Sequence, residues 1–295
     1  LSIRRQRQMC IRDRAIFDRF KKTGEAEMSF IDHLEILRGT IVRSISSILI
    51  AAVVIFIYRD WIMDNVITGP LNSDFITYRA FCKLSHWLHL GDSLCMPPVK
   101  TQLQSTTFGG QFLSAISMAM VGGIIVAFPF VFWQIWSFIK PALKEKEVKN
   151  TRFAIFWVSF FFFLGAGFGF FVLGPFTFNF LASFQLGTKN VITTIPTFSD
   201  YLDNLTNLIL GCGIAFEMPV IVFLLTKVGI ITPKFLSTTR KYAVIIILIV
   251  SAFITPSPDW YSQTIVFIPL YTLFEFSIFV SRWAFKSMEI EEEWD

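Results

Sequence analysis

The sequence has few charged residues, few histidines and few cysteines for its length. Of its 295 residues, 16% are charged, 3 are histidine and 4 are cysteine. Four scattered cysteines are too few for the disulfide framework of a small secreted domain. The apolar stretches contain no His-Glu-x-x-His, Gly-x-Ser-x-Gly or paired-aspartate motif, which a membrane-embedded hydrolase would need. We therefore find no sign of an enzyme and predict no cofactor and no resident metal.

Apolar residues dominate instead, at 54% of the chain, and include 35 phenylalanines. Soluble domains average roughly 45–50%. The apolar residues also gather in runs, several of them near the length of about 20 residues that a helix needs to cross a bilayer. We therefore predict an all-α, polytopic membrane protein with six transmembrane helices, the fifth and sixth of them short. The predicted spans are about 41–58, 112–139, 153–173, 205–228, 242–254 and 265–280.

The remaining segments differ from the spans in composition. Residues 1–14 are basic, poor in apolar side chains and unlike the rest of the chain, so we expect a non-native leader there. Residues 15–40 are expected to form a cytoplasmic amphipathic segment, with apolar residues at helical spacing after residue 28. Residues 41–283 then form the membrane domain, and 284–295 an acidic cytoplasmic tail.

The basic residues indicate how the spans are oriented. Lysine and arginine cluster at 140–152, between the second and third spans, at 227–241, between the fourth and fifth, and at 282–286, after the sixth. The opposite connections are poorer in them. Loops rich in lysine and arginine stay in the cytoplasm, so we expect both termini there. This pattern indicates membrane topology rather than nucleic-acid binding.

The end of the second span carries the most distinctive stretch, FPFVFWQIWSFIKPALKEKEVK at 128–149. Aromatic residues favour the membrane interface and charges favour the water beyond it, so composition alone indicates an ordinary span end. Pro129 should kink this span because it removes an intrahelical hydrogen bond. The spacing Pro-x4-Gln-x-Trp-x-Phe-x2-Pro-x-Leu-x3-Glu, from Pro129 to Glu147, resembles the second span and first cytoplasmic loop of the TatC family. That family is the receptor subunit of the twin-arginine protein translocase.

Other stretches resemble the same family in the same order. His33-Leu34-Glu35-Ile36-Leu37-Arg38 is similar to the amino-terminal motif His-Leu-x-Glu-Leu-Arg. It departs from the motif because Ile36 occupies the acidic position and Glu35 lies one residue earlier, about 100° around the helix. Further matches are Gly69-Pro70-Leu71 in the first external loop, Phe216-Glu217-x-Pro219 in the fourth span, the turn 255–259 ending at Asp259, and Gln263 near the start of the sixth span.

The resemblance covers about residues 28–283 and implies both a fold and a function. The fold is a concave, glove-like bundle of six helices with both termini in the cytoplasm. The function is that of receptor and core subunit of the twin-arginine translocase in the cytoplasmic (inner) membrane. Such a subunit binds the twin-arginine signal peptides of folded cargo proteins and helps transport them with the proton-motive force. The implied partners are TatA/TatB-type single-span proteins and further copies of the chain, with no nucleic acid.

The resemblance also implies where the signal peptide binds. Two adjacent guanidinium groups need carboxylates in a partly desolvated site, where bidentate charge-assisted hydrogen bonds are strongest. We assign the main contact to Glu147, although without the resemblance we would expect Glu147 to pair with Lys144 or another loop lysine. The other expected contacts are Phe138, Arg38, Glu35, Pro141 and Leu143.

Glu217 lies deep within a predicted span, far along the chain from other charges. A carboxylate at such a depth costs about 2.5–3.5 kcal/mol on insertion scales unless it is protonated or paired. Two interpretations stay open: a protonated side chain bonded to a neighbouring helix, or a side chain that faces a cavity or a partner helix. We expect Gln263 and Asp259 to share this polar contact, with extension to the interface as the alternative for Gln263. The prolines predicted to be structural are Pro70, Pro129 and Pro219.

The long first external loop contains Cys82, His86, His89 and Cys95. Thiolate and imidazole groups suit tetrahedral zinc, but this spacing matches none of the common structural zinc sites. Because the loop is expected to face an oxidising compartment, a Cys82–Cys95 disulfide is the favoured interpretation. Free thiols and a zinc site are the alternatives.

A different class of function also fits a lone carboxylate within a span. Proton-coupled secondary transporters place such residues in their helices. They usually contain inverted repeats, and we find none in this sequence. We therefore favour the receptor function.

Overall fold

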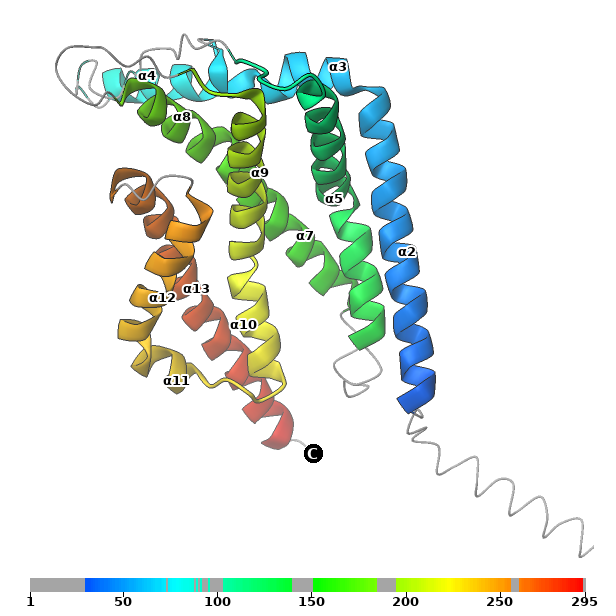
Figure 1. The fold of residues 1–295 in the computed structure, drawn as a ribbon. Helices are drawn as coiled ribbons and strands as arrows, with labels where there is room; N and C mark the ends of the chain where they lie inside the picture. The colour runs from blue at the N-terminus through cyan, green and yellow to red at the C-terminus, as the bar shows by residue number, and fades with distance from the viewer. Residues whose placement is uncertain are drawn as a thin grey trace, which may run out of the picture. The chain divides into compact units, whose positions relative to one another are not determined.

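The computed structural model describes residues 30–72, 74–87, 89, 91, 95, 103–139, 151–184, 195–255 and 260–293. Within these ranges the chain is helical and contains no strand, apart from an isolated bridge between Gln104 and Thr197. The chain forms two compact units, Leu1–Arg43 and Ser44–Asp295. The described helices are drawn in Figure 1. The predicted all-α class is confirmed.

The first long helix, α2, runs without a break over Phe30–Ile57. We expected a boundary near residue 40 between an amphipathic segment and the first span. There is no proline in this stretch, and one glycine in a helix costs only about 1 kcal/mol, so the two segments form a single helix. Beyond Ser44 its apolar side chains are largely exposed, with Ile50 at 67% and Val53 at 60%. A helix that is apolar on its exposed faces is typical of a membrane span.

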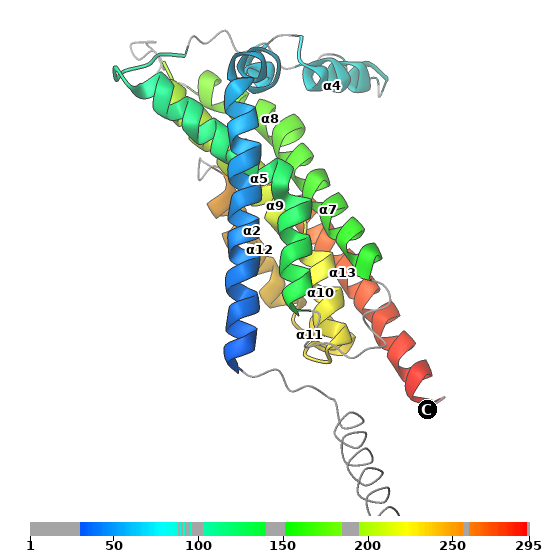
Figure 2. The ribbon, with the colours of Figure 1, turned by 90° about the vertical axis from the view of Figure 1, so that its right-hand side faces the viewer.

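The first loop folds into four short elements: α3 (Arg59–Ile62), η1 (Met63–Ile67), η2 (Gly69–Leu71) and α4 (Ile76–Trp87). In both ribbon views α4 lies across one end of the helices of its unit (Figures 1 and 2). The Tyr78 hydroxyl on α4 donates to the carbonyl of Pro70 at 2.8 Å. Burial raises the pKa of Tyr78 to about 12, so this hydroxyl keeps its proton at neutral pH. Pro70 is thereby buried and held in η2.

The second span is the helix α5, Gly110–Ile139, which continues through Pro129. A Cβ added at Gly123 would lie 2.9 Å from the backbone oxygen of Ile48 on α2. The backbones of the two helices are therefore in close contact there, which small residues allow between membrane helices.

The third span is longer than predicted. It runs through α7 (Thr151–Phe168), a π-helical turn η4 (Gly169–Leu173) and α8 (Gly174–Ser183). We expected the third span to end at about residue 173, before Gly174-Pro175, and this was wrong. Pro175 lies in the first turn of α8, where a missing N–H is tolerated. The carbonyl of Phe171, four residues before Pro175, instead accepts a hydrogen bond from the Thr77 hydroxyl of α4.

The last part of the chain contains five helices. Their bounds are Phe198–Ala215 for α9, Met218–Lys227 for α10, Pro233–Thr238 for α11, Arg240–Ile254 for α12 and Trp260–Glu293 for α13. The helix α12 has 15 residues, or about 22 Å, against a hydrocarbon core of about 30 Å. The fifth span is short, as predicted. The helix α13 has 34 residues and extends beyond both limits of the predicted sixth span, 265–280.

Among the described residues, five helical segments are long and apolar enough to cross a membrane. The predicted fifth span, α12, falls below that length. A hydrophobic core joins α9 to the α12–α13 hairpin, with Leu208, Cys212 and Leu270 all buried to 1% exposure or less. The five segments are Glu35–Ile57, Gly110–Phe138, Ile155–Ser183, Phe198–Lys227 and Ser262–Lys286.

Candidate functional site

The residues expected to bind the signal peptide fall into three groups. Phe138 lies in the last turn of α5 and is half-buried. Glu35 and Arg38 are exposed on α2, in the N-terminal unit. Glu147, Pro141 and Leu143 lie outside the described residues. The structure therefore does not place the three groups together.

The α5 motif that leads to Phe138 points into the protein. Gln134 is 8% exposed and Trp136 is 5% exposed. The Trp136 ring is stacked on Phe132 at 6.1 Å between centroids, and Phe128 stacks on Phe162 of α7 at 3.5 Å. Trp136 thus packs against the protein instead of forming part of the interfacial belt that its position in the sequence indicates.

Glu217 lies in the turn between α9 and α10, and Pro219 explains why the helix breaks there. Proline has no N–H and its ring clashes with the carbonyl four residues earlier, here that of Ala215. The Glu217 N–H donates instead to Ile214, three residues back, at 3.1 Å. The Glu217 carbonyl then accepts hydrogen bonds from Val220 and Ile221, each at 3.0 Å. The two helices are therefore joined through the residue that carries the carboxyl group.

The side chain of Glu217 is buried, with 8% exposed. Its carboxyl group interacts with the backbone of Phe162 on α7. The other oxygen, Oε1, is buried and has no hydrogen-bond partner among the described residues. A buried polar atom left without a partner costs about 1–3 kcal/mol. Glu217 therefore has one contact with a neighbouring helix and one hydrogen-bonding position unused.

Glycines allow α7 and α9 to come this close. A Cβ added at Gly165 would lie 2.5 Å from the Cys212 carbonyl oxygen, and one at Gly169 would lie 2.5 Å from that of Leu208. Real Cβ atoms do not approach so closely, so only glycine fits. The Gly165-x3-Gly169 spacing thus serves helix packing within the chain, and it places α7 against the Glu217 turn.

Two more buried polar atoms lie on the helices that pack against α9. The indole Nε1 of Trp136 on α5 and the hydroxyl of Ser159 on α7 have no hydrogen-bond partner among the described residues. The sequence did not single out either as a polar contact, because tryptophan and serine are common in membrane helices. Their burial becomes evident only from the packing.

Gln263 already has a partner within the chain. Its side-chain Nε2 donates to the carbonyl of Leu248 at 3.0 Å and so links α13 to α12. Asp259 lies outside the described residues. A nearby ion pair was not predicted: Arg240 of α12 and Glu275 of α13 lie 2.8 Å apart, and the Tyr271 hydroxyl also donates to Glu275 at 3.2 Å. Helices α12 and α13 are thus held together by polar contacts as well as by apolar packing.

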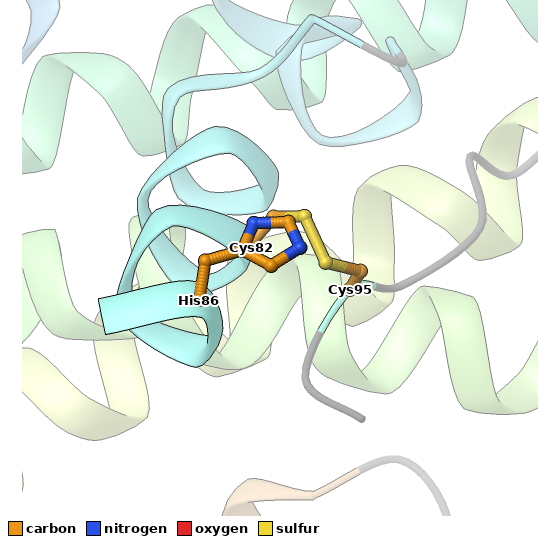
Figure 3. A group of neighbouring side chains, drawn as sticks. All are labelled: Cys82, His86 and Cys95. Atoms are coloured by element: carbon orange, nitrogen blue, oxygen red, sulfur yellow. A yellow bond between two sulfur atoms is a disulfide. The ribbon is translucent and has the colours of Figure 1, made fainter. Parts of the chain in front are cut away.

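In the first loop, Cys82 and Cys95 form a disulfide (Figure 3). Cys82 belongs to α4, and the imidazole ring of His86, one helical turn later, lies beside the two sulfur atoms (Figure 3). Cys212, in contrast, is a free and buried thiol in α9. The described cysteines therefore divide into a paired loop site and an inert core position.

Long apolar helices, a helical hairpin whose first helix is short and a carboxyl group buried at a helix break define a multi-pass membrane protein. The family model for the Sec-independent protein translocase protein (TatC) matches residues 32–269. The chain therefore belongs to the TatC family and has its six-span, all-α fold. This is a family of transport subunits and not of enzymes.

Curated relatives and solved structures agree with this membership. The chain is 36% identical over 268 residues to the TatC protein of Blattabacterium sp. subsp. Periplaneta americana, with 90% of this chain and 99% of that protein covered. It is 30% identical to TatC of Carboxydothermus hydrogenoformans, with 86% and 93% covered. A crystal structure of the twin-arginine translocase receptor TatC superposes with a TM-score of 0.63 at 28% identity, covering 85% of this chain and 99% of that one. A second, in DDM, gives 0.66 at 27% identity, covering 84% and 99%.

Proposed function

We infer that this chain is the receptor and core subunit of a twin-arginine translocase. It binds twin-arginine signal peptides and helps to transport folded proteins across the membrane with the proton-motive force. The observation that carries this function is the family match over residues 32–269, which includes the whole stretch from Pro129 to Glu147. The membrane is the cytoplasmic (inner) membrane, with both termini on the cytoplasmic side.

Glu147 supplies the main contact with the signal peptide. A carboxylate binds a guanidinium group through two parallel hydrogen bonds, which a lysine ammonium cannot reproduce. Phe138, in the last turn of α5, then packs on the aliphatic part of the peptide, and Pro141 and Leu143 border the same stretch of chain. Glu35 and Arg38 provide a second polar contact from the exposed start of α2.

The Glu217 turn receives a second ligand, a polar residue of a TatA/TatB-type single-span helix. The support for this is the buried Oε1 atom, which has no hydrogen-bond partner among the described residues. An interhelical hydrogen bond in a membrane is worth about 1–2 kcal/mol. Gln263 contributes less, because its amide already donates to Leu248, and Asp259 lies in the adjoining turn. Further copies of the chain assemble in the same receptor complex.

Cross-linking in membranes tests the receptor function. A photo-reactive twin-arginine peptide and its twin-lysine version are presented to the parent, to Glu147→Gln and to the control Glu145→Gln. A charge-assisted hydrogen bond contributes about 1.5–3 kcal/mol, so Glu147→Gln should weaken capture of the twin-arginine peptide roughly 10- to 150-fold. The control should capture the peptide like the parent. Equal loss in both variants would show a general charge effect and contradict the role of Glu147.

Ile36 provides a separate arm of the same experiment. If the parent captures the twin-arginine peptide and not the twin-lysine peptide, this supports the receptor function directly. If the parent does not distinguish the two peptides, Ile36→Glu restores the acidic residue of the family motif. Discrimination gained by Ile36→Glu would show a receptor weakened at that position. Failure of both proteins to discriminate would overturn the receptor function.

A further inference from the structure

Three metal-ligating side chains gather at the end of α4. The sulfur atoms of Cys82 and Cys95 and an imidazole nitrogen of His86 all lie within 4.8 Å of one another. Figure 3 shows the imidazole ring directly beside the disulfide. Cys82 and Cys95 are half-buried and His86 is exposed, so the group is open to ions from one side. The signal-peptide and partner contacts proposed above make no use of it.

The local fold brings these three groups together. Cys82 and His86 are four residues apart on α4 and therefore lie on one face of the helix. The chain then turns back sharply: the His89 N–H donates to the His86 carbonyl at 3.2 Å. His89 and Gly91 both adopt positive φ angles, 57° and 62°. This turn lies between α4 and Cys95, whose sulfur is bonded to that of Cys82.

Contacts other than the disulfide stabilise this arrangement. The buried Ser85 hydroxyl donates to the Gly91 carbonyl and closes the turn. The helix α4 is itself anchored, because Tyr78 bonds to Pro70 and Phe81 packs edge-on against Phe176 of α8 at 5.0 Å. Since none of these contacts involves sulfur, α4 and its turn should persist when the disulfide is reduced.

We propose that reduction of the Cys82–Cys95 disulfide converts this cluster into a binding site for a thiophilic divalent cation of the Zn²⁺ type. The ligands are Sγ of Cys82, Sγ of Cys95 and one imidazole nitrogen of His86, and water completes the tetrahedron. A dithiol reductant transfers two electrons and two protons to the disulfide and becomes a disulfide itself. The cation then displaces both thiol protons and forms two metal–sulfur bonds and one metal–nitrogen bond.

The geometry suits such a cation. With Zn–S near 2.3 Å and Zn–N near 2.0–2.1 Å, the ligand atoms of a tetrahedral site lie roughly 3.5–3.8 Å apart. That is within the 4.8 Å that encloses the three groups here. The sulfur atoms of the reduced pair need only to move apart by side-chain rotation and a small shift of the chain at Cys95. Two thiolates also neutralise the charge of the divalent cation.

Co²⁺ is a suitable spectroscopic substitute for zinc in the test. The full chain is purified in detergent with Cys10→Ser and Cys212→Ser, so that Cys82 and Cys95 are the remaining cysteines. It is then reduced with a dithiol, desalted without oxygen and titrated with Co²⁺. We expect one Co²⁺ per chain, with thiolate-to-cobalt charge-transfer bands that Zn²⁺ abolishes. The unreduced protein should show no such bands.

Two histidine variants make the ligand assignment specific. His86→Ala should weaken Co²⁺ binding at least tenfold, whereas the control His89→Asn, which keeps a residue that tolerates a positive φ angle, should bind like the parent. Re-formation of the disulfide in air checks that each variant keeps its loop structure. The proposal is overturned if the reduced protein shows no charge-transfer bands, if His86→Ala binds like the parent, or if His89→Asn alone loses binding. None of these results depends on signal-peptide binding.

Discussion

Glu217 carries a carboxyl group that is buried among membrane helices, where few acidic residues occur. Its carboxyl group is 8% exposed, interacts with the backbone of Phe162, and leaves Oε1 without a partner among the described residues. The chain thus carries a polar group whose burial costs stability in the isolated protein. Such a cost is typical of a group that functions in an encounter with another molecule.

Replacement of the Glu217 carboxyl group should raise the stability of the protein and lower its transport function. Glu217→Leu removes the unpartnered oxygen and keeps most of the side-chain volume, so the free energy of unfolding in detergent should rise by about 1–3 kcal/mol. Export of a twin-arginine cargo should fall, because the loss of one interhelical hydrogen bond of about 1–2 kcal/mol weakens association roughly 5- to 30-fold. Thermal unfolding and cargo export measure the two effects. A variant that is less stable but exports normally would contradict this role.

For single residues, the sequence predicted some roles correctly and missed others. Glu217 was evident beforehand, because a carboxylate within an apolar run needs an explanation. Trp136 was misjudged, since its position near a span end indicates the interface while its 5% exposure shows protein packing. The bond from Thr77 to the Phe171 carbonyl was not predictable, because it joins residues that are far apart in the sequence. The proline indicates that the carbonyl four residues earlier lacks its helical donor, but it does not indicate which group bonds to that carbonyl.

The close contact between the helices α7 and α9 depends on glycines, whose side chain is a single hydrogen atom. Gly165 and Gly169 face backbone carbonyls of α9, whereas a Cβ at Gly167 would meet nothing within 4 Å. Three glycines with the same spacing therefore differ in role. A Gly-x3-Gly spacing is typical of close helix packing, but it does not indicate which helix is the partner.

Gly165 and Gly167 of α7 give a matched test. Gly165→Ala should destabilise the protein by about 1–3 kcal/mol, because the new methyl group forces the helices apart. Gly167→Ala should be neutral or stabilising by up to about 1 kcal/mol, since alanine favours a helix more than glycine does. Thermal unfolding in the same detergent compares the two. Equal effects would show that helix propensity, and not the contact with α9, determines stability here.

Helix ends were harder to predict than helix centres. Each predicted span overlaps a described helix, because the bilayer requires apolar runs of this kind. The helices α2, α8 and α13 all extend beyond their predicted limits. Nothing in the apolar pattern stops a helix at the membrane surface, and charged residues such as those at 289–293 are good helix formers. Hydropathy therefore locates the membrane, whereas local backbone chemistry sets the helix ends.

For the whole molecule, the distribution of lysine and arginine predicts a single topology. Alkaline phosphatase fused within 184–195 should be active, because we expect that connection to be external. Fused within 228–232 it should be inactive, because the segment next to Lys227 and Lys234 stays in the cytoplasm. Green fluorescent protein at the same two points should give the opposite pattern. Phosphatase activity at the second point would overturn the assigned orientation.

Membership of the family could be inferred from the sequence because its motifs occur in order along most of the chain. The proposed signal-peptide site stays a prediction, because Glu147, its proposed main residue, lies outside the described ranges, and Glu35 and Arg38 belong to the N-terminal unit. Contacts such as Arg240–Glu275 also escaped prediction. They depend on how α12 folds back along α13, which composition does not encode.

The break between α9 and α10 also has a mechanical consequence. The helix α9 is locked to α7 by glycine contacts, while α10 is tied to α13, where the buried hydroxyls of Thr226 and Ser281 lie 2.8 Å apart. Pro219 removes a backbone bond that would stiffen a continuous rod. Because α10 packs against α13 more extensively than α9 does, α10 would follow a tilt of α13 more closely than α9. Such a tilt would bend the chain at Glu217 and turn its carboxyl group.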